Sequence, residues 1–191
     1  MLLYIHGFNS SPGSQKAELV RDYMGRHHAN EPLAIPRLAT TPQAAMAQLE
    51  GIVEPALAAG EPLRLMGSSL GGFFSSYLAE KYGGRAVLIN PAVRPFELLL
   101  DYLGPQENPY TGECFEVTQA HMAQLQALDT QVIHHPDRFL TLLQSGDEVL
   151  DYRQAVDKYH HGQMVIEPGG DHSFVGFEQH LPAACRFLGL A

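Results

Sequence analysis

Five consecutive residues, Gly67-Ser68-Ser69-Leu70-Gly71, have the spacing of a nucleophile elbow. This sharp turn joins a strand to a helix and pushes a nucleophilic side chain out over the edge of a sheet. Side chains two positions before and after the nucleophile would collide in the turn, which explains Gly67 and Gly71. Glycines do not flank Ser68 at that spacing, so Ser69 is the predicted nucleophile. The chemistry would be acyl transfer to a serine hydroxyl.

A serine nucleophile needs a base that accepts its proton and an acid that orients the base, and both residue types follow Ser69 in the chain. Asp147 comes shortly after the apolar run 139–143, and His172 comes shortly after the apolar run 164–166. If both runs are parallel strands, their carboxyl ends share one edge of a sheet with Ser69. The three side chains can therefore meet despite their separation in sequence.

Other residues compete for these roles. Glu148 and Asp151 lie close enough to Asp147 to remain alternatives for the acid, or Asp147 could be an ordinary loop or capping carboxylate. Asp171 is not a candidate for the acid, because its side chain cannot easily reach the ring of the adjacent His172. His6 is better explained as a structural residue that holds a loop through its ring nitrogens.

Acyl transfer also needs two N–H groups that bind the oxygen on which negative charge develops. The backbone N–H of Leu70 directly follows the nucleophile and opens a helix. The second candidate is the N–H of Phe8, in the polar loop 6–13 that follows the first apolar run. Gly7 would let this loop approach the serine closely.

Short apolar runs alternate with amphipathic stretches, which predicts an α/β fold with a mostly parallel, doubly wound sheet of about six strands and helices on both faces. The strands are expected at 2–5, 33–35, 63–66, 86–89, 139–143 and 164–166. Helices are expected near 14–28, 42–59, 152–159 and 181–188, with another directly after Ser69. Pro55 should kink the second helix or end it early.

The alternation of strands and helices breaks off in the proline-rich stretch 91–136, which we interpret as an insertion into a single domain of residues 1–191. Short helices are expected near 96–103 and 118–128. Arg94, near the start of this insertion, could contact an anionic group of the substrate, and a structural salt bridge is the alternative. Phe73, Phe74 and the leucines 98–100 are expected to pack in the core or cap more than to line a substrate pocket.

Composition narrows the possible partners. With 45% hydrophobic residues, 191 residues suffice for one well-buried core. A net charge of −9 argues against binding to nucleic acid or to anionic membranes. No apolar stretch is long enough to span a bilayer, and the two cysteines, Cys114 and Cys185, form neither a metal-binding spacing nor a disulfide framework. We therefore expect a cytoplasmic protein without metal or cofactor.

Several stretches carry a family resemblance: His6-Gly7-Phe8-Asn9-Ser10-Ser11-Pro12, Gly67-Ser68-Ser69-Leu70-Gly71-Gly72, and residues 90–99, 107–112 and 146–152. Together with the chain order Ser, Asp, His, they resemble the α/β-hydrolase superfamily and, within it, the YqiA-type esterases. The resemblance covers nearly the whole chain. It implies a compact hydrolase that lacks the first two strands of the larger fold and acts on short acyl esters and acyl-CoA thioesters. It places the nucleophile, acid and base on Ser69, Asp147 and His172. It also implies that the insertion 91–136 is a lid or cap that covers the serine and selects the acyl group.

The expected function is therefore a serine esterase that uses these three residues and an acyl-enzyme intermediate. Its partner would be a small acyl ester or thioester, and nothing in the sequence predicts an oligomeric state. Two alternatives remain open. The same residues could cleave another acyl bond, such as a peptide or a lactone, or the chain could be a binding protein that keeps the fold without the chemistry.

Overall fold

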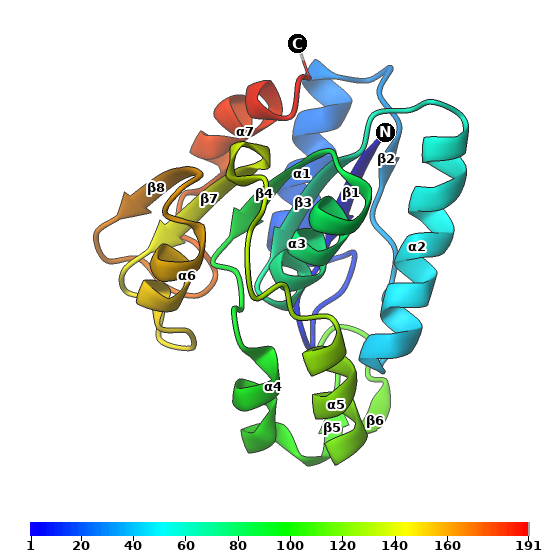
Figure 1. Ribbon diagram of the computed structural model, residues 1–191, viewed down its shortest axis with the longest axis vertical. Coiled ribbons are helices and arrows are strands. Elements are labelled where there is room, and N and C mark those ends of the chain that lie inside the picture. Colours follow the sequence, from blue (N-terminus) through cyan, green and yellow to red (C-terminus); the bar gives the residue numbers. More distant parts are fainter. Residues whose placement is uncertain (191) are drawn as a thin grey trace.

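The centre of the fold is a six-stranded sheet in which every neighbouring pair of strands is parallel. The computed structural model describes residues 1–190 and orders the strands β2-β1-β3-β4-β7-β8 (Figure 1). Their bounds are β1 Leu2–Ile5, β2 Leu33–Ala34, β3 Arg64–Ser68, β4 Arg85–Ile89, β7 Phe139–Gln144 and β8 Gln163–Glu167. The predicted mostly parallel, doubly wound sheet is confirmed.

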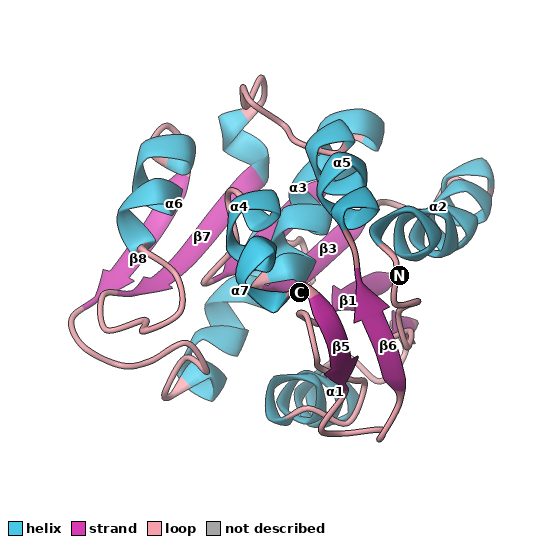
Figure 2. Ribbon diagram, turned by 90° about the horizontal axis from the view of Figure 1, so that it is seen from below, coloured by secondary structure: helices cyan, strands magenta, loops and turns pink. Residues whose placement is uncertain are grey.

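Helices cover both faces of the sheet, as predicted (Figure 1, Figure 2). Along β1, Leu2 and Tyr4 pack into one core, and Leu3 and Ile5 pack into another, because successive side chains of a strand point to opposite faces. The first core also contains side chains of α1 and α7, and the second contains side chains of α2, α3 and α6. The bounds of these helices are α1 Gln15–His27, α2 Pro42–Ala58, α3 Leu70–Tyr82, α6 Tyr152–Tyr159 and α7 Leu181–Phe187.

The order of the strands reverses at β1. From β1 the chain first moves to β2 at one edge, and from β3 onward it moves toward β8 at the opposite edge. The loops that follow β1 and β3 therefore diverge and leave a crevice at the carboxyl ends of the strands, where ligands bind in open α/β sheets. Phe8, in the loop after β1, and Ser69, directly after β3, line one cavity there.

The segment 91–136 lies beyond the carboxyl ends of the strands, below the sheet in Figure 1. It contains α4 Pro95–Leu98, a 3₁₀ turn Leu99–Tyr102, β5 Gly104–Glu107, β6 Cys114–Val117 and α5 Gln119–Ala127. The helical pieces lie where the sequence predicts them, but β5 and β6 form an antiparallel hairpin that it does not predict. β5 consists of a glycine, a proline and two polar residues, none of them buried, so the apolar pattern of a strand is missing there. In β6, Phe115 and Val117 alternate with the exposed Cys114 and Glu116, a signal of only four residues.

Of the two outcomes predicted for Pro55, a kink or an early end of the helix, the early end is wrong, because α2 continues to Ala58. Proline removes the bond to the carbonyl group four residues earlier, here that of Gly51. Gly51 is exposed, so water can bond to that carbonyl group. Thr41 caps the start of α2, where its hydroxyl accepts a hydrogen bond from Ala44 N. Within residues 1–190, neither α2 nor any other helix combines the length and apolar character that a membrane crossing requires.

Candidate active site

Ser69 lies in a strained turn between β3 and α3. Its backbone angles are φ 55° and ψ −119°, a conformation that non-glycine residues rarely adopt. A Cβ atom at Gly67 would overlap the carbonyl group of Gly71, and one at Gly71 would overlap the carbonyl oxygen of Ile5. Both positions therefore require glycine, as the sequence predicts for an elbow.

Asp147 and His172 form a hydrogen-bonded pair. His172 Nδ1 lies 2.8 Å from Asp147 Oδ2 and 3.0 Å from Oδ1. The Asp147 side chain is 2% exposed and also accepts bonds from the N–H groups of Val149 and Leu150. An ionised carboxylate only accepts hydrogen bonds, so the proton of the neutral ring lies on Nδ1 and Nε2 keeps its lone pair.

Ser69 and His172 line the same two cavities, which places the serine and the imidazole in one site. Within residues 1–190, no hydrogen bond between Ser69 Oγ and the His172 ring is formed. In proteins without bound substrate, catalytic hydrogen bonds are often long and tighten only in the complex. The arrangement is therefore compatible with proton transfer from Ser69 to Nε2.

The loop that carries His172 is held by polar residues at the ends of the neighbouring strands. Asn90, directly after β4, donates from Nδ2 to the carbonyl oxygens of Asp171 at 3.1 Å and His172 at 3.4 Å. Gln144, at the end of β7, accepts bonds from Asp171 N and Val175 N. Neither residue was predicted from the sequence to support the site. The feature that could have identified them is that each is a polar residue at the end of a buried strand.

Glu148 also holds this loop. Its Oε2 accepts a 2.9 Å hydrogen bond from the backbone N–H of His172, and this bond lowers the pKa of the Glu148 carboxyl. The sequence leaves Glu148 open as the acid, but it contacts the backbone of His172 and not the ring. Asp151, the other alternative, accepts a bond from Arg153 N at the start of α6 and acts as a helix cap.

His6 ties the loop after β1 to the chain before α2, as its sequence context predicts. Its Nδ1 lies 3.0 Å from the carbonyl oxygen of Gly7, and its Nε2 accepts a 3.3 Å bond from Leu38 N. Burial lowers the pKa of His6, and the bond to Gly7 partly offsets this effect. With both nitrogens bonded, the ring has a structural role.

The backbone N–H groups of Phe8 and Leu70 have no acceptor among the residues that the structure describes. Phe8 and Leu70 line the same cavity as Ser69. A Cβ atom at Gly7 would lie 3.2 Å from Ser69 Cβ, so a larger residue would crowd the serine. Two free donors next to the serine can bind an oxygen that gains negative charge.

The two cavities beside Ser69 differ in chemistry. One, of about 180 Å³, is mostly apolar, and its lining includes Leu98, Leu99 and Tyr102 of the segment 91–136. Leu99 is buried in the core, as expected, and it also lines this cavity, as Leu98 does. Leu100 is exposed. Phe73 and Phe74 are buried in the core, as expected.

The other cavity, of about 200 Å³, is mostly polar. Its lining includes Ser10, Ser14, Lys16 and Tyr110. Lys16 Nζ donates a 2.8 Å bond to the carbonyl oxygen of Ser173, the residue after His172. Burial lowers the pKa of Lys16, and the charges of Asp171 and Asp147 partly offset this effect.

Arg94 lies outside both cavities. It lines a separate groove with Asp129 and Lys158 and donates to Glu97 Oε1 at 3.2 Å. Its side chain is 60% exposed, so this is a surface ion pair of little energetic weight. Of the two roles considered for Arg94, the geometry favours the structural salt bridge.

Comparison with solved structures finds the same fold in several proteins. Alpha/beta hydrolase domain-containing protein 10 from mouse is 17% identical with a TM-score of 0.68, and the match covers 99% of this chain and 88% of that one. A monoacylglycerol lipase from Paleococcus ferrophilus is 16% identical with a TM-score of 0.67, covering 100% and 94%. Est1E from Butyrivibrio proteoclasticus, with ferulic acid bound, is 14% identical with a TM-score of 0.67, covering 97% and 86%.

These matches establish the α/β-hydrolase fold, and at such low identities they establish nothing finer. A family model described as "Uncharacterised protein family (UPF0227)" matches residues 1–189. This agrees with the resemblance that the sequence motifs carry. The chain therefore belongs to the family UPF0227 and has the α/β-hydrolase fold.

Proposed function

We propose that this protein is a serine hydrolase that cleaves carboxylic esters, including acyl-CoA thioesters, through an acyl-enzyme. The observation that carries the proposal is the Asp147–His172 pair, with Nδ1···Oδ2 at 2.8 Å, whose imidazole lines the same cavity as Ser69 at its strained elbow. A carboxylate, an imidazole and a serine in this arrangement are the groups that acyl transfer requires.

In the proposed reaction, His172 Nε2 takes the proton of Ser69 as Oγ attacks the carbonyl carbon. The N–H groups of Phe8 and Leu70 bind the resulting oxyanion. The intermediate then collapses, and the departing alkoxide or thiolate takes the proton from His172 and leaves as the alcohol or thiol. Water attacks the acyl-enzyme with His172 again as base, releasing the carboxylic acid and free Ser69. Asp147 holds the ring in position throughout.

The two cavities suggest where the halves of the ester bind. The apolar cavity with Leu98 and Leu99 suits the acyl chain, because burial of apolar surface favours binding. The polar cavity with Lys16 and Tyr110 suits the leaving group, since its lining offers hydrogen bonds and one positive charge. In this arrangement the segment 91–136 acts as the lid that the sequence predicts, and its α4 and 3₁₀ turn select the acyl chain.

Ester hydrolysis is also the chemistry named for proteins with this fold, among them a monoacylglycerol lipase and an esterase from Pyrococcus furiosus. Extension to thioesters rests on the family resemblance of the sequence. A thiolate is a better leaving group than an alkoxide, so the same residues serve both substrates.

Labelling with a fluorophosphonate, followed by peptide mass spectrometry, tests the proposal. We expect one adduct, on Ser69, and no adduct in Ser69→Ala. Mixing the wild type with p-nitrophenyl butyrate should release a burst of p-nitrophenolate. Ser69→Ala and His172→Ala should each lower kcat by roughly 10⁴-fold or more. A wild-type protein without an adduct at Ser69 would disprove the mechanism.

The same experiment addresses the two alternatives. A binding protein without chemistry gives neither adduct nor burst. A peptidase or lactonase gives the adduct on Ser69 but turns over its own class of substrate faster than p-nitrophenyl or CoA esters. Screening leaving groups at one fixed acyl chain, and then acyl chains at one leaving group, separates these cases.

A further inference from the structure

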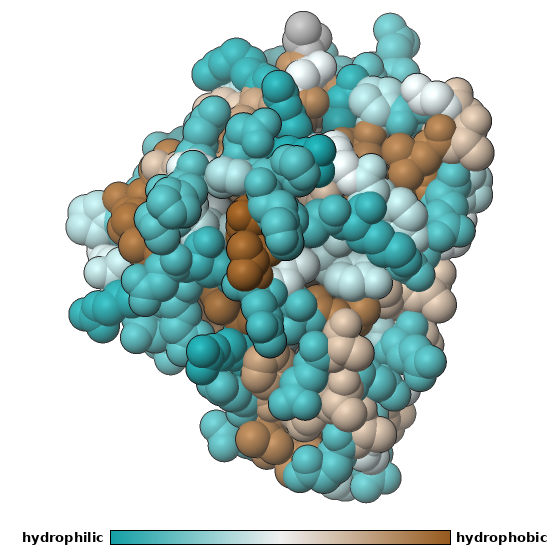
Figure 3. All heavy atoms as spheres, viewed as in Figure 1, coloured by the Kyte–Doolittle hydropathy of each residue, from teal (hydrophilic) through white to brown (hydrophobic). Residues whose placement is uncertain are grey.

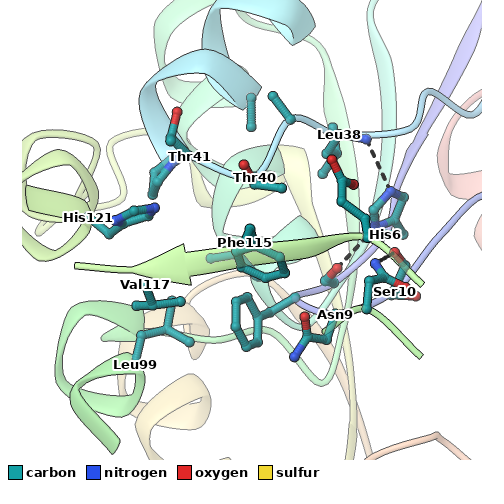
Figure 4. Close-up of a pocket in the computed structure, with 18 of the residues that line it drawn as sticks. His6, Asn9, Ser10, Leu38, Thr40, Thr41, Leu99, Phe115, Val117 and His121 are labelled. Atoms are coloured by element: carbon teal, nitrogen blue, oxygen red, sulfur yellow. Dashed lines mark hydrogen bonds between the residues drawn. The ribbon is translucent and has the colours of Figure 1, made fainter. Parts of the chain in front are cut away.

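A third cavity adjoins the apolar cavity that holds Ser69. Its volume is about 60 Å³, which is room for about four atoms of the size of a water molecule. The two cavities share four lining residues, Phe8, Asn9, Leu70 and Leu99. Figure 4 shows this third cavity, which we call the His121 cavity.

Three parts of the chain close the His121 cavity. They are the loop after β1, the residues 37–42 that lead into α2, and the segment 91–136 through β6 and α5. The Arg37–Glu113 ion pair, with N···O at 2.7 Å, links two of them. Most of the lining surface is apolar, with Leu38, Phe74 and Phe115 among its residues.

His121 places one hydrogen-bond donor into this apolar surrounding. The backbone N–H of Thr118 donates to His121 Nδ1 at 3.0 Å, so Nδ1 is an acceptor and the neutral ring carries its proton on Nε2. His121 is 7% exposed, and its Nε2 has no partner among the residues that the structure describes. In Figure 4 the ring extends from α5 toward Thr40 and Phe115.

A buried N–H group without an acceptor is costly, and such groups are rare in folded proteins. An acceptor that reaches the cavity would remove this cost. The cavity is close to the reaction centre, because it is lined by Phe8 and Leu70, whose N–H groups hold the acyl carbonyl oxygen in the proposed mechanism. An acyl chain that passes these residues would bring its far end to His121.

We propose that the His121 cavity binds the end of a short oxygenated acyl chain and that His121 Nε2–H donates to a keto or hydroxyl oxygen on it. This inference rests on the proposed function and adds a substrate class: esters of short oxo- or hydroxy-acids, which the enzyme prefers over esters of plain fatty acids. His121 would determine specificity without taking part in the chemistry.

The first test compares p-nitrophenyl 4-oxopentanoate with p-nitrophenyl pentanoate, and the 5-oxohexanoate with the hexanoate. For each pair the readout is the ratio of kcat/KM, oxo over plain, in the wild type and in His121→Phe, which keeps a ring but removes the donor. We expect the wild-type ratio to exceed the His121→Phe ratio by about fivefold or more for at least one pair, the effect of one neutral hydrogen bond.

Thr118→Ala is the matched control. It removes the hydroxyl group that lies 2.9 Å from His121 Nδ1 but keeps the backbone N–H that orients the ring. It also disturbs the start of α5, as His121→Phe does. If His121 has only a structural role, both variants lose activity on all four esters alike and the ratios do not change. Ratios that are equal in wild type and His121→Phe overturn the proposal.

A second test does not depend on catalysis. Ser69→Ala is titrated with methyl 4-oxopentanoate and with methyl pentanoate, and binding is followed by NMR chemical shifts. Tighter binding of the oxo ester, lost in the double variant with His121→Phe, supports the His121 cavity even if the wild type hydrolyses no ester, in which case only the proposed function fails. Hydrolysis without any preference in rate or binding leaves the proposed function intact and overturns this inference.

Discussion

Ser69 has a backbone conformation with φ 55° and ψ −119° that costs a non-glycine residue roughly 1–3 kcal/mol. The surrounding turn imposes it: Ser69 N–H donates to the carbonyl oxygen of Ile89, and the Ser69 carbonyl oxygen accepts from Gly72 N and Ala92 N. The strained backbone at Ser69 therefore lowers the free energy of unfolding at the residue that the proposed chemistry uses.

Replacing Ser69 with glycine should relieve this strain. Glycine also lowers the free energy of unfolding by about 0.5–1 kcal/mol, because it gives the unfolded chain more entropy. Since Ser69→Ala keeps the strain, Ser69→Gly is expected to be about 1 kcal/mol more stable than Ser69→Ala. Urea denaturation of both inactive variants measures the difference. Equal stabilities would mean that the turn at Ser69 relaxes at little cost.

His6 should make the stability depend on pH. Its pKa is lowered from 6.5 by burial, so the unfolded chain binds the proton more readily. The contribution of His6 to the free energy of unfolding is therefore fully present above about pH 6.5 and is lost as the pH falls toward the folded pKa. Between about pH 7.5 and 5.5 the wild type should lose stability more steeply than His6→Asn, as measured by urea denaturation.

The exposed His161 provides the control for this effect. His161→Asn should keep the wild-type slope of stability against pH. If His161→Asn and His6→Asn change the slope equally, the buried ring of His6 is not its source.

At the scale of elements, the site depends on how the ends of β4, β7 and β8 are tied together. Asn90 accepts a 3.0 Å bond from Gln144 N and donates to the carbonyl oxygens of the His172 loop. Gly146 N donates to Gly169 O at 2.7 Å, which joins the loops after β7 and β8. Asp147 and His172 meet because these two loops are bonded to each other.

Glu148 tests this coupling as a positioning residue. Glu148→Ala removes the acceptor for His172 N–H and should lower kcat by about 10- to 100-fold with little change in KM, because a shift of the imidazole mainly affects the transition state. Glu148→Gln keeps an acceptor oxygen and should stay within about twofold of the wild type. Equal losses in both variants would assign the effect to charge and not to position.

For the molecule as a whole, the net charge of −9 opposes the approach of a polyanion such as CoA. In the lower part of the surface, over α4 and the 3₁₀ turn, apolar side chains are interspersed with polar ones (Figure 3). Leu100 is 45% exposed and Leu103 is 41% exposed there. This part of the surface therefore offers apolar contact but no long-range attraction to an anionic thioester.

Turnover of butyryl-CoA should accordingly rise several-fold in kcat/KM as ionic strength increases from about 10 to about 200 mM, because salt screens the repulsion. Neutral p-nitrophenyl butyrate should change little. Arg94→Ala should lower butyryl-CoA turnover by less than twofold, since Arg94 is paired with Glu97 away from the reaction cavities. A loss of tenfold or more in this variant would instead make Arg94 a substrate contact.

The sequence by itself determined the parts of the fold that depend on local pattern. Buried parallel strands are short continuous apolar runs, so the strands at 2–5 and 86–89 could be located from the run of apolar residues alone. The elbow could be located because only glycine fits at positions 67 and 71, and Asp147 and His172 could be nominated because each follows a strand. These are constraints between residues that are close in the chain.

Only the tertiary structure decided the features that depend on contacts between distant segments. β5 lacks an apolar alternation because none of its residues is buried, so the pairing of β5 with β6 leaves little pattern in the sequence. Glu148 could be distinguished from Asp147 only by its bond to the backbone of His172. The buried donor of His121 became visible only when the loop after β1, the start of α2 and α5 closed a cavity around it. Free energies of burial and hydrogen bonding depend on three-dimensional neighbours, and these are set by packing and not by adjacency in the chain.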